Sequence, residues 1–258
     1  MACKNCNQPL KTDHSYCSHC GAKVIRNRLS FKNLWYDITE RYFNLDNTFL
    51  KTFWHLFTKP EVVIMGYIDG VRKRYLNPIG YFGIALTLSG LLVFLIRKVF
   101  MDDIGMDIFD IGADQQVFRD VFDSVMDFQA FVFVILIPML AFPSWLLFNS
   151  QRHIFSEHMV SFTYIQAHYT IATFPISILV LSVAPNTYTS YGVINVLVML
   201  LYSLYVFKRI TSYGLGQFLF RSAVFLLLFV VEYFLVSNLI FLVLLFTGFV
   251  SLDSFRPG

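Results

Sequence analysis

Long apolar runs separated by short polar connections dominate the pattern of this sequence. A helix rises about 1.5 Å per residue, so about 20 apolar residues cross the roughly 30 Å hydrocarbon core of a bilayer. Five runs approach or exceed that length, at residues 79–96, 128–148, 164–184, 191–207 and 222–246. The pattern therefore predicts an all-α polytopic membrane protein with about five transmembrane helices, whose membrane domain covers residues 79–258.

The composition agrees with a protein that lies mostly in lipid. Of its 258 residues, 56% are hydrophobic, 29 are phenylalanine and only 14% are charged. A soluble domain usually has about 25% charged residues. The sequence therefore predicts that most of this chain is surrounded by membrane lipid, which is also an expected binding partner.

The distribution of basic residues predicts how the spans are oriented. With the N-terminus in the cytosol and five spans, 16 of the 20 Lys and Arg residues lie on the cytosolic side. Cytosolic connections of membrane proteins carry such an excess of positive charge. We therefore expect a multi-pass protein of the cytoplasmic (inner) membrane, with its N-terminus in the cytosol and its C-terminus outside.

The four cysteines of the chain all lie within its first 20 residues, as Cys3, Cys6, Cys17 and Cys20. They form two Cys-x-x-Cys knuckles, and four thiolates suit the tetrahedral coordination of Zn²⁺. Disulfides are the alternative, but they need an oxidising compartment. A thioredoxin-like redox pair would need a βαβ unit that this segment is too short to contain. Residues 1–24 are therefore predicted to form a small zinc ribbon with a structural Zn²⁺.

The segment between the cysteines and the first span, residues 25–78, is predicted to form cytosolic amphipathic helices. Between residues 31 and 57, aromatic and aliphatic residues recur at helical spacing, with charged and amide residues on the opposite side. Aromatic-rich helices of this kind beside a span commonly lie in the bilayer interface. The alternative is that their apolar face packs on the cytosolic ends of the spans, and the sequence leaves both open.

Three consecutive basic residues, Arg72, Lys73 and Arg74, directly precede the first span. Basic residues at this position attract anionic lipid head groups, at about 1 kcal/mol each. They are therefore candidate lipid head-group contacts. A simpler interpretation is that they serve only as a positively charged anchor on the cytosolic side.

Two ionisable residues lie within predicted spans, His168 in the third and Glu232 in the fifth. Ionisable groups inside a membrane are costly and are functional candidates for that reason. Together they could carry a proton or bind a head group. The alternative is structural, with a protonated Glu232 hydrogen bonded to His168 or to a tyrosine hydroxyl of another helix.

Residues 50–78 also carry a recognisable string of prolines, glycine and aromatic residues. It reads Pro60, then Tyr67-x-x-Gly70-x-Arg72, then Tyr75-x-x-Pro78. Together with the N-terminal cysteine pairs, this string resembles a family of bacterial multi-pass membrane proteins known only as a domain of unknown function. The resemblance implies the architecture of nearly the whole chain, and it implies no activity, substrate or catalytic residue.

No motif of a nucleotide-binding, zinc-protease or serine-hydrolase site occurs in the sequence. The basic N-terminal region is too aromatic and too close to the membrane to indicate nucleic-acid binding. We therefore expect a non-enzymatic scaffold or adaptor that presents a cytosolic zinc ribbon to a protein partner or to lipid. One alternative is a small transporter or channel that uses Glu232 and the polar third span, and a second is a lipid-modifying membrane enzyme.

Overall fold

The structure is a computed structural model, and it describes residues 2–11, 15–22, 24, 45–101, 103–104, 126–150 and 152–246. The chain divides into two compact units, Met1–Asn47 and Thr48–Gly258. The predicted amphipathic positions before residue 45 lie outside the described residues, as does the C-terminal end that was expected outside the cell.

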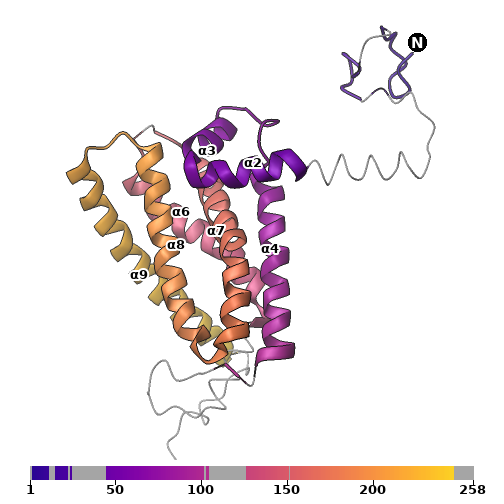
Figure 1. Cartoon of the computed structure of the whole chain (residues 1–258). Coiled ribbons are helices and arrows are strands. Elements are labelled where there is room, and N and C mark those ends of the chain that lie inside the picture. The colour runs from indigo at the N-terminus through magenta and orange to yellow at the C-terminus, as the bar shows by residue number, and fades with distance from the viewer. Residues whose placement is uncertain are drawn as a thin grey trace, which may run out of the picture. The chain divides into compact units, whose positions relative to one another are not determined.

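The described part of the larger unit contains five long helices (Figure 1). They are α4 (Pro78–Leu95), α6 (Gln129–Leu147), α7 (Phe155–Val183), α8 (Tyr188–Ile210) and α9 (Leu215–Phe246). A π-helical turn, Ile96–Phe100, extends α4, and a 3-10 turn, Pro185–Thr187, leads into α8. Each of the five is long and apolar enough to cross a membrane, and no strand is found among the described residues. The predicted all-α chain with five membrane-spanning helices is confirmed.

Two shorter helices precede the first span, α2 (Leu45–Thr58) and α3 (Pro60–Ile68). Pro60 and Pro78 stand at the first turns of α3 and α4, where the missing N–H of proline is no loss. The Asn77 Oδ1 atom accepts a hydrogen bond of 2.7 Å from the Gly80 N–H and so caps α4. Gly70, just beyond α3, has a φ of +94°, which a side chain would disfavour. The proline–glycine string thus sets the helix ends.

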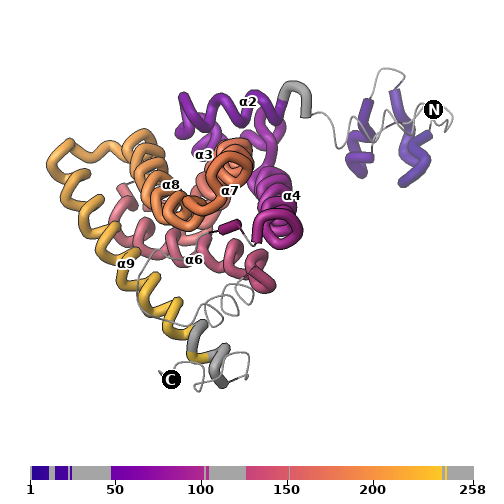
Figure 2. Tube along the Cα trace, turned by 60° about the horizontal axis from the view of Figure 1, so that its bottom comes forward, coloured from indigo at the N-terminus to yellow at the C-terminus, as the bar shows by residue number. Residues whose placement is uncertain are grey.

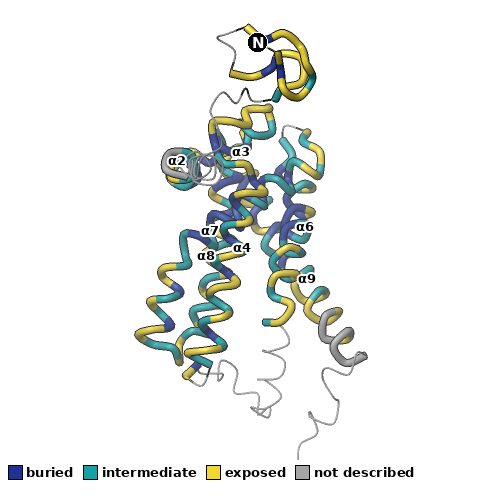
Figure 3. The backbone as a smooth tube through the Cα atoms, turned by 90° about the vertical axis from the view of Figure 1, so that its right-hand side faces the viewer, coloured by how far each residue is buried: buried dark blue, intermediate teal, exposed yellow. Residues whose placement is uncertain are grey.

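Helices α4, α7 and α8 lie side by side in one layer, and α6 and α9 form a second layer against it (Figure 2). Helix α7 lies between α4 and α8 and also packs on α6, while α9 packs mainly on α6. Buried positions concentrate in the half of the bundle next to α2 and α3 (Figure 3). They include Tyr81, Phe162, Tyr164, Phe207 and Phe225. The core of the larger unit is therefore aromatic and lies towards one end of the spans.

Helices α2 and α3 lie across the ends of α4, α7 and α8 at this end of the bundle (Figure 1). We call residues 48–77 the cap. Leu56 of α2 and Val63 and Ile64 of α3 are completely buried against the bundle. Of the two interpretations of residues 31–57, packing on the span ends therefore holds for the face of α2 that carries Leu56. The opposite face of α2 remains exposed, with Leu50 and Trp54 more than half accessible.

Tyrosine hydroxyls from the spans tie the cap to the bundle. Tyr202 and Tyr205 of α8 donate to the carbonyl oxygens of Leu56 and Phe57, both at 2.9 Å. Tyr164 of α7 donates at 2.7 Å to the carbonyl oxygen of Leu76. On the surface, Arg209 of α8 binds Glu61 of α3 through two hydrogen bonds of 2.6 and 3.1 Å. The cap is thus fixed to both α7 and α8 by polar contacts.

Thr52 joins α2 to the end of the α3–α4 connection, and its replacement tests how much this link stabilises the cap. Its completely buried hydroxyl donates to the Thr48 carbonyl oxygen at 2.6 Å and accepts from the Leu76 N–H at 2.9 Å. Thr52→Val keeps the shape but leaves that N–H without its partner, which should destabilise the cap by about 1–3 kcal/mol. Amide exchange at Leu76, measured by mass spectrometry on purified protein, should accelerate accordingly. Thr52→Ser keeps the hydroxyl and should exchange like the wild type; equal protection in the valine variant contradicts this account.

Candidate functional site

The four cysteines converge in the smaller unit. Their sulfur atoms all lie within 4.8 Å of one another, and the pairs Cys3–Cys20 and Cys6–Cys17 are each separated by 3.7 Å. Four sulfurs at about 2.3 Å from a tetrahedral metal ion lie about 3.8 Å apart. A disulfide would need about 2.05 Å, and the four are free cysteines. The arrangement can therefore hold one metal ion.

The two knuckles are copies of the same backbone turn. In each, the residue after the second cysteine has a left-handed backbone, with a φ of 57° at Asn7 and 70° at Gly21. Its N–H donates at 2.9 Å to the carbonyl oxygen of the first cysteine, Cys3 or Cys17. Glycine and asparagine are the residues that adopt this conformation most readily. The sequence therefore repeats a local rule, Cys-x-x-Cys followed by Asn or Gly, that turns both sulfurs to one side.

The surroundings of the second knuckle favour the ionised form of its thiols. The Asn5 side chain and then the Ala22 backbone N–H donate to the Cys20 sulfur and lower the pKa of this thiol to about 6. The N–H groups of Cys20 and His19 lower the pKa of Cys17. Metal ions bind the thiolate form of cysteine. These contacts therefore prepare the second knuckle for metal binding.

His168 lies in α7 where the cap meets the spans, and it is 1% exposed. Its Nδ1 atom is 2.9 Å from the Tyr81 hydroxyl of α4. The rings of Phe57, Phe53 and Tyr202 surround it, with centroids 4.2, 5.0 and 5.4 Å from that of His168. Its Nε2 atom has no hydrogen-bond partner. An aromatic cage built from α2, α4 and α8 thus encloses the imidazole, and the sequence pattern gave no indication of that cage.

Glu232 lies on α9 and is not part of this cage. Helix α9 packs mainly on α6 and less on α8, and the cage around His168 takes its side chains from α2, α4 and α8 and none from α9. The Glu232 Oε2 atom is buried and has no hydrogen-bond partner among the described residues. The structural alternative, a hydrogen bond from Glu232 to His168 or to a tyrosine hydroxyl, is not formed among the described residues. Hydropathy places both residues inside the membrane, but it does not show which helices are neighbours.

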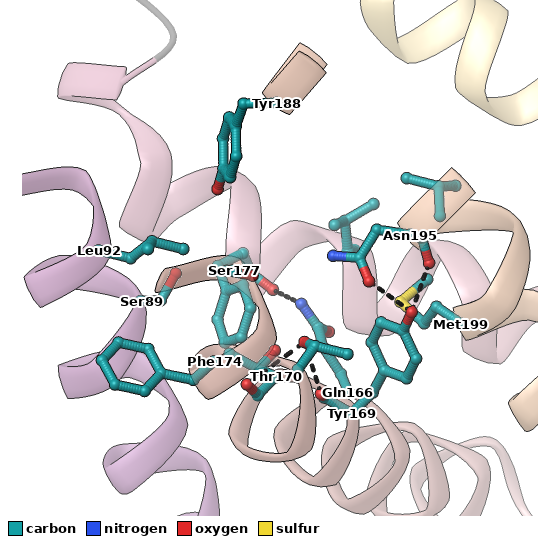
Figure 4. A pocket seen from close by; sticks show the side chains of 14 residues that line it. Ser89, Leu92, Gln166, Tyr169, Thr170, Phe174, Ser177, Tyr188, Asn195 and Met199 are labelled. Carbon is teal, nitrogen blue, oxygen red and sulfur yellow. Dashed lines mark hydrogen bonds between the residues drawn. The ribbon is translucent and has the colours of Figure 1, made fainter. Parts of the chain in front are cut away.

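Polar residues of α7 on both sides of His168 help to line a cavity of about 200 Å³ between α4, α6, α7 and α8 (Figure 4). Gln166 is 2% exposed, and its Nε2 atom donates to the Phe133 carbonyl oxygen at 2.8 Å while its Oε1 atom has no partner. The Tyr169 hydroxyl donates at 2.8 Å to the backbone carbonyl of Asn195. The cavity wall carries hydroxyl and amide groups and no charged group among the described lining residues, including Ser89, Gln166, Tyr169, Thr170, Ser177 and Asn195.

The basic run before the first span is exposed, and its members contact aromatic rings of the cap. The Arg72 guanidinium carbon is 5.5 Å from the Tyr67 ring centroid, and that of Arg74 is 5.6 Å from the Tyr75 centroid. Lys73, between them, is also exposed. The structure adds Lys51 of α2 to this set, because its Nζ atom lies 5.7 Å from the same Tyr75 centroid.

The cap should become less stable as the pH falls, because His55 in α2 then gains a proton. Its Nδ1 atom lies 2.7 Å from the Tyr75 hydroxyl. Burial first, then the charges of Lys51, Lys59 and Arg74, hold the pKa of His55 below its usual value of 6.5. Since the folded-state pKa is the lower one, the stability contributed by the neutral ring is complete above about pH 6.5. It is lost as the pH falls through the folded-state pKa.

This effect can be measured as the protection factors of α2 amides between pH 7 and pH 5. Protection should fall with pH in the wild-type chain. It should fall less in His55→Gln, whose amide can still bind the Tyr75 hydroxyl but does not titrate. An identical pH dependence in both proteins would show that His55 is not the titrating group.

Comparison with known proteins adds one finding. Residues 46–90 match a family model described as "Protein of unknown function (DUF3667)". The matched segment covers nearly all of α2, then α3, the connection to α4 and the first part of α4. No curated protein and no solved structure matches the chain. The match and the five long apolar helices fit an uncharacterised family of multi-pass membrane proteins.

Proposed function

We propose that this chain is a non-enzymatic scaffold of the cytoplasmic membrane. In this proposal the ribbon, residues 1–24, holds a structural Zn²⁺ and presents a cytosolic docking surface to a protein partner. The five spans and the cap anchor that surface to the membrane. The observation that carries the proposal is the convergence of four cysteine sulfurs at the spacing of a tetrahedral metal site.

Zinc is the metal that this donor set favours. Four thiolates in a tetrahedral arrangement fill the coordination shell, which is typical of structural zinc sites. A filled shell leaves no position for a substrate or an activated water molecule. The ribbon also has little apolar core of its own, with Leu10 the only buried side chain among its described residues besides Cys3 and Cys17. Metal binding can supply the missing folding free energy.

Two further observations support the cytosolic docking role. The described residues of the ribbon include no acidic side chain, while Lys4 and Lys11 are exposed. The ribbon therefore suits a protein partner with an acidic surface. In the larger unit, seven basic residues of the connections and adjoining helix ends lie at the cap end of the bundle, which supports a cytosolic cap. They are Arg72, Lys73, Arg74, Arg152, Lys208, Arg209 and Arg221.

The test is a cross-linking experiment in cells with the double variant Cys17→Ser, Cys20→Ser. A photo-cross-linking residue replaces the exposed Lys4 in the first knuckle, and the captured partner is detected on gels and identified by mass spectrometry. We expect the double variant to give at least about tenfold less cross-linked product than the wild type. With only two of its four thiolates left, the site no longer binds the metal ion that folds the ribbon. Metal analysis should show about one zinc per wild-type chain and nearly none in the variant.

Ser18→Ala is the matched control, because Ser18 lies within the same knuckle, is exposed and is not a ligand. It should keep both its zinc and its cross-linked product. Reporter fusions after each span should show that the double variant still inserts five spans. Undiminished cross-linking in the zinc-free double variant would contradict the scaffold proposal.

A second candidate function, a small transporter, is favoured by the cavity beside α7, whose largely apolar wall carries several uncharged hydroxyl and amide groups. The sequence predicts that Glu232 and the third span act together, but Glu232 lies on α9, and no described residue of α9 lines the cavity. The cavity therefore suits a small uncharged solute, with the free Gln166 Oε1 atom as an acceptor.

Proteoliposome uptake of uncharged solutes such as glycerol and urea tests this candidate. Uptake above that of protein-free liposomes should fall at least about tenfold in Gln166→Leu, which removes the acceptor; a lost buried hydrogen bond corresponds to about that factor. Glu232→Gln should leave the uptake unchanged. The absence of uptake by the intact protein, or equal uptake by Gln166→Leu, excludes transport through this cavity.

A further inference from the structure

Cationic groups from two separate segments of the cap converge on one buried tyrosine. Tyr75 is 4% exposed, although it directly follows the exposed basic run. The Lys51 ammonium and the Arg74 guanidinium lie 5.7 and 5.6 Å from the centroid of its ring. On the same tyrosine, the hydroxyl lies 2.7 Å from His55 Nδ1. Lys51 and His55 come from α2, whereas Arg74 comes from the α3–α4 connection.

The acidic residues of the cap do not neutralise this cluster. The cap contains two carboxylates, Glu61 and Asp69. Both Glu61 oxygens bind Arg209 of α8. Asp69 ends α3, is exposed, and forms no ion pair with Lys51 or Arg74 in the described structure. Burial is the main cause of the lowered pKa of His55, and the nearby charges of Lys51, Lys59 and Arg74 add to it.

An exposed apolar stripe lies beside the cationic cluster on α2. Leu50 is 51% and Trp54 62% exposed, and the two residues are one helical turn apart. At about 100° per residue, Lys51 and His55 occupy the neighbouring sector of the same helix. Helix α2 runs across the ends of the spans rather than along them (Figure 1). An exposed apolar sector beside a cationic sector, on a helix that lies across the spans, is typical of a helix at a bilayer surface.

We infer that Lys51 and Arg74, positioned by the Tyr75 ring, bind the phosphate of an anionic membrane phospholipid whose acyl chains contact Leu50 and Trp54. A guanidinium presents paired N–H donors that match phosphate oxygens, and a lysine adds a compact positive charge. Arg72 and Lys73 lie in the same exposed run and add to the local positive potential. This inference is independent of the ribbon and of any metal ion in it.

Lipid-bound bromine provides a direct test, because it quenches nearby tryptophan fluorescence. The chain has three tryptophans, so Trp35→Phe with Trp145→Phe leaves Trp54 as the only reporter. The full-length protein is placed in phosphatidylcholine nanodiscs that contain a minor fraction of either brominated phosphatidylglycerol or brominated phosphatidylcholine. We expect quenching of Trp54 to be several-fold stronger with the brominated anionic lipid.

The pair Lys51→Gln, Arg74→Gln should abolish this preference. Each basic residue near an anionic surface contributes about a fivefold factor in binding, so loss of the pair corresponds to about 25-fold. Lys98→Gln with Arg152→Gln is the matched control, because it removes two exposed positive charges elsewhere. It should keep the preference. Equal quenching by the two brominated lipids in the wild-type cap, or an unchanged preference in the Lys51/Arg74 variant, overturns the inference.

Two measurements keep the test valid if the double variant fails to fold. Raising the salt concentration from 0.1 to 0.5 M should weaken the preference of the unaltered cap, since exposed charges are screened. Arg74→Lys keeps the charge but loses the paired donors, so it should retain only part of the preference. A preference that survives high salt and is identical in Arg74→Lys also overturns the inference.

Discussion

The free carbonyl groups at the end of α2 are the constraint on which the larger unit depends. The last four carbonyls of a helix have no partner within the helix, and at a membrane surface water is not always available to replace it. Here the hydroxyls of Tyr202 and Tyr205 satisfy the carbonyls of Leu56 and Phe57. The end of a short helix outside the spans is thus completed by side chains from within a span. Cap and bundle therefore form one packed unit.

The cage around His168 follows from the same arrangement. Because α2 is held across the span ends, Phe53 and Phe57 reach an imidazole that lies in α7. The Tyr81 hydroxyl then shares a hydrogen bond with Nδ1, the one hydrogen bond of this ring within the described part of the chain. A buried polar group is tolerated when it has a partner. With one nitrogen bonded and the other enclosed by rings, His168 connects four helices: α2, α4, α7 and α8.

The sequence was sufficient for the features that depend on neighbours along the chain. Apolar run length was enough to predict five spans, and the spacing of Cys3, Cys6, Cys17 and Cys20 was enough to predict that their sulfurs meet. Contacts across the fold were not predictable in the same way. Helical periodicity assigns Glu232 and His168 to faces of helices, but only packing decides that they face different neighbours. Likewise, nothing in the basic run indicates that Arg74 shares the Tyr75 ring with Lys51, 23 positions earlier in the chain.

The unequal lengths of the spanning helices have a consequence for the surrounding lipid. Helix α6 has 19 residues and α9 has 32, which correspond to about 28 and 48 Å at 1.5 Å per residue. No single hydrocarbon thickness matches both, so the longer helix must tilt, as its slanted course in Figures 1 and 2 illustrates, or extend beyond the core. Hydrophobic mismatch therefore makes the angle of α9 a function of bilayer thickness. Helix α4, whose 18 residues correspond to about 27 Å, is close to the minimum span and should tilt less than α9 in bilayers of ordinary thickness.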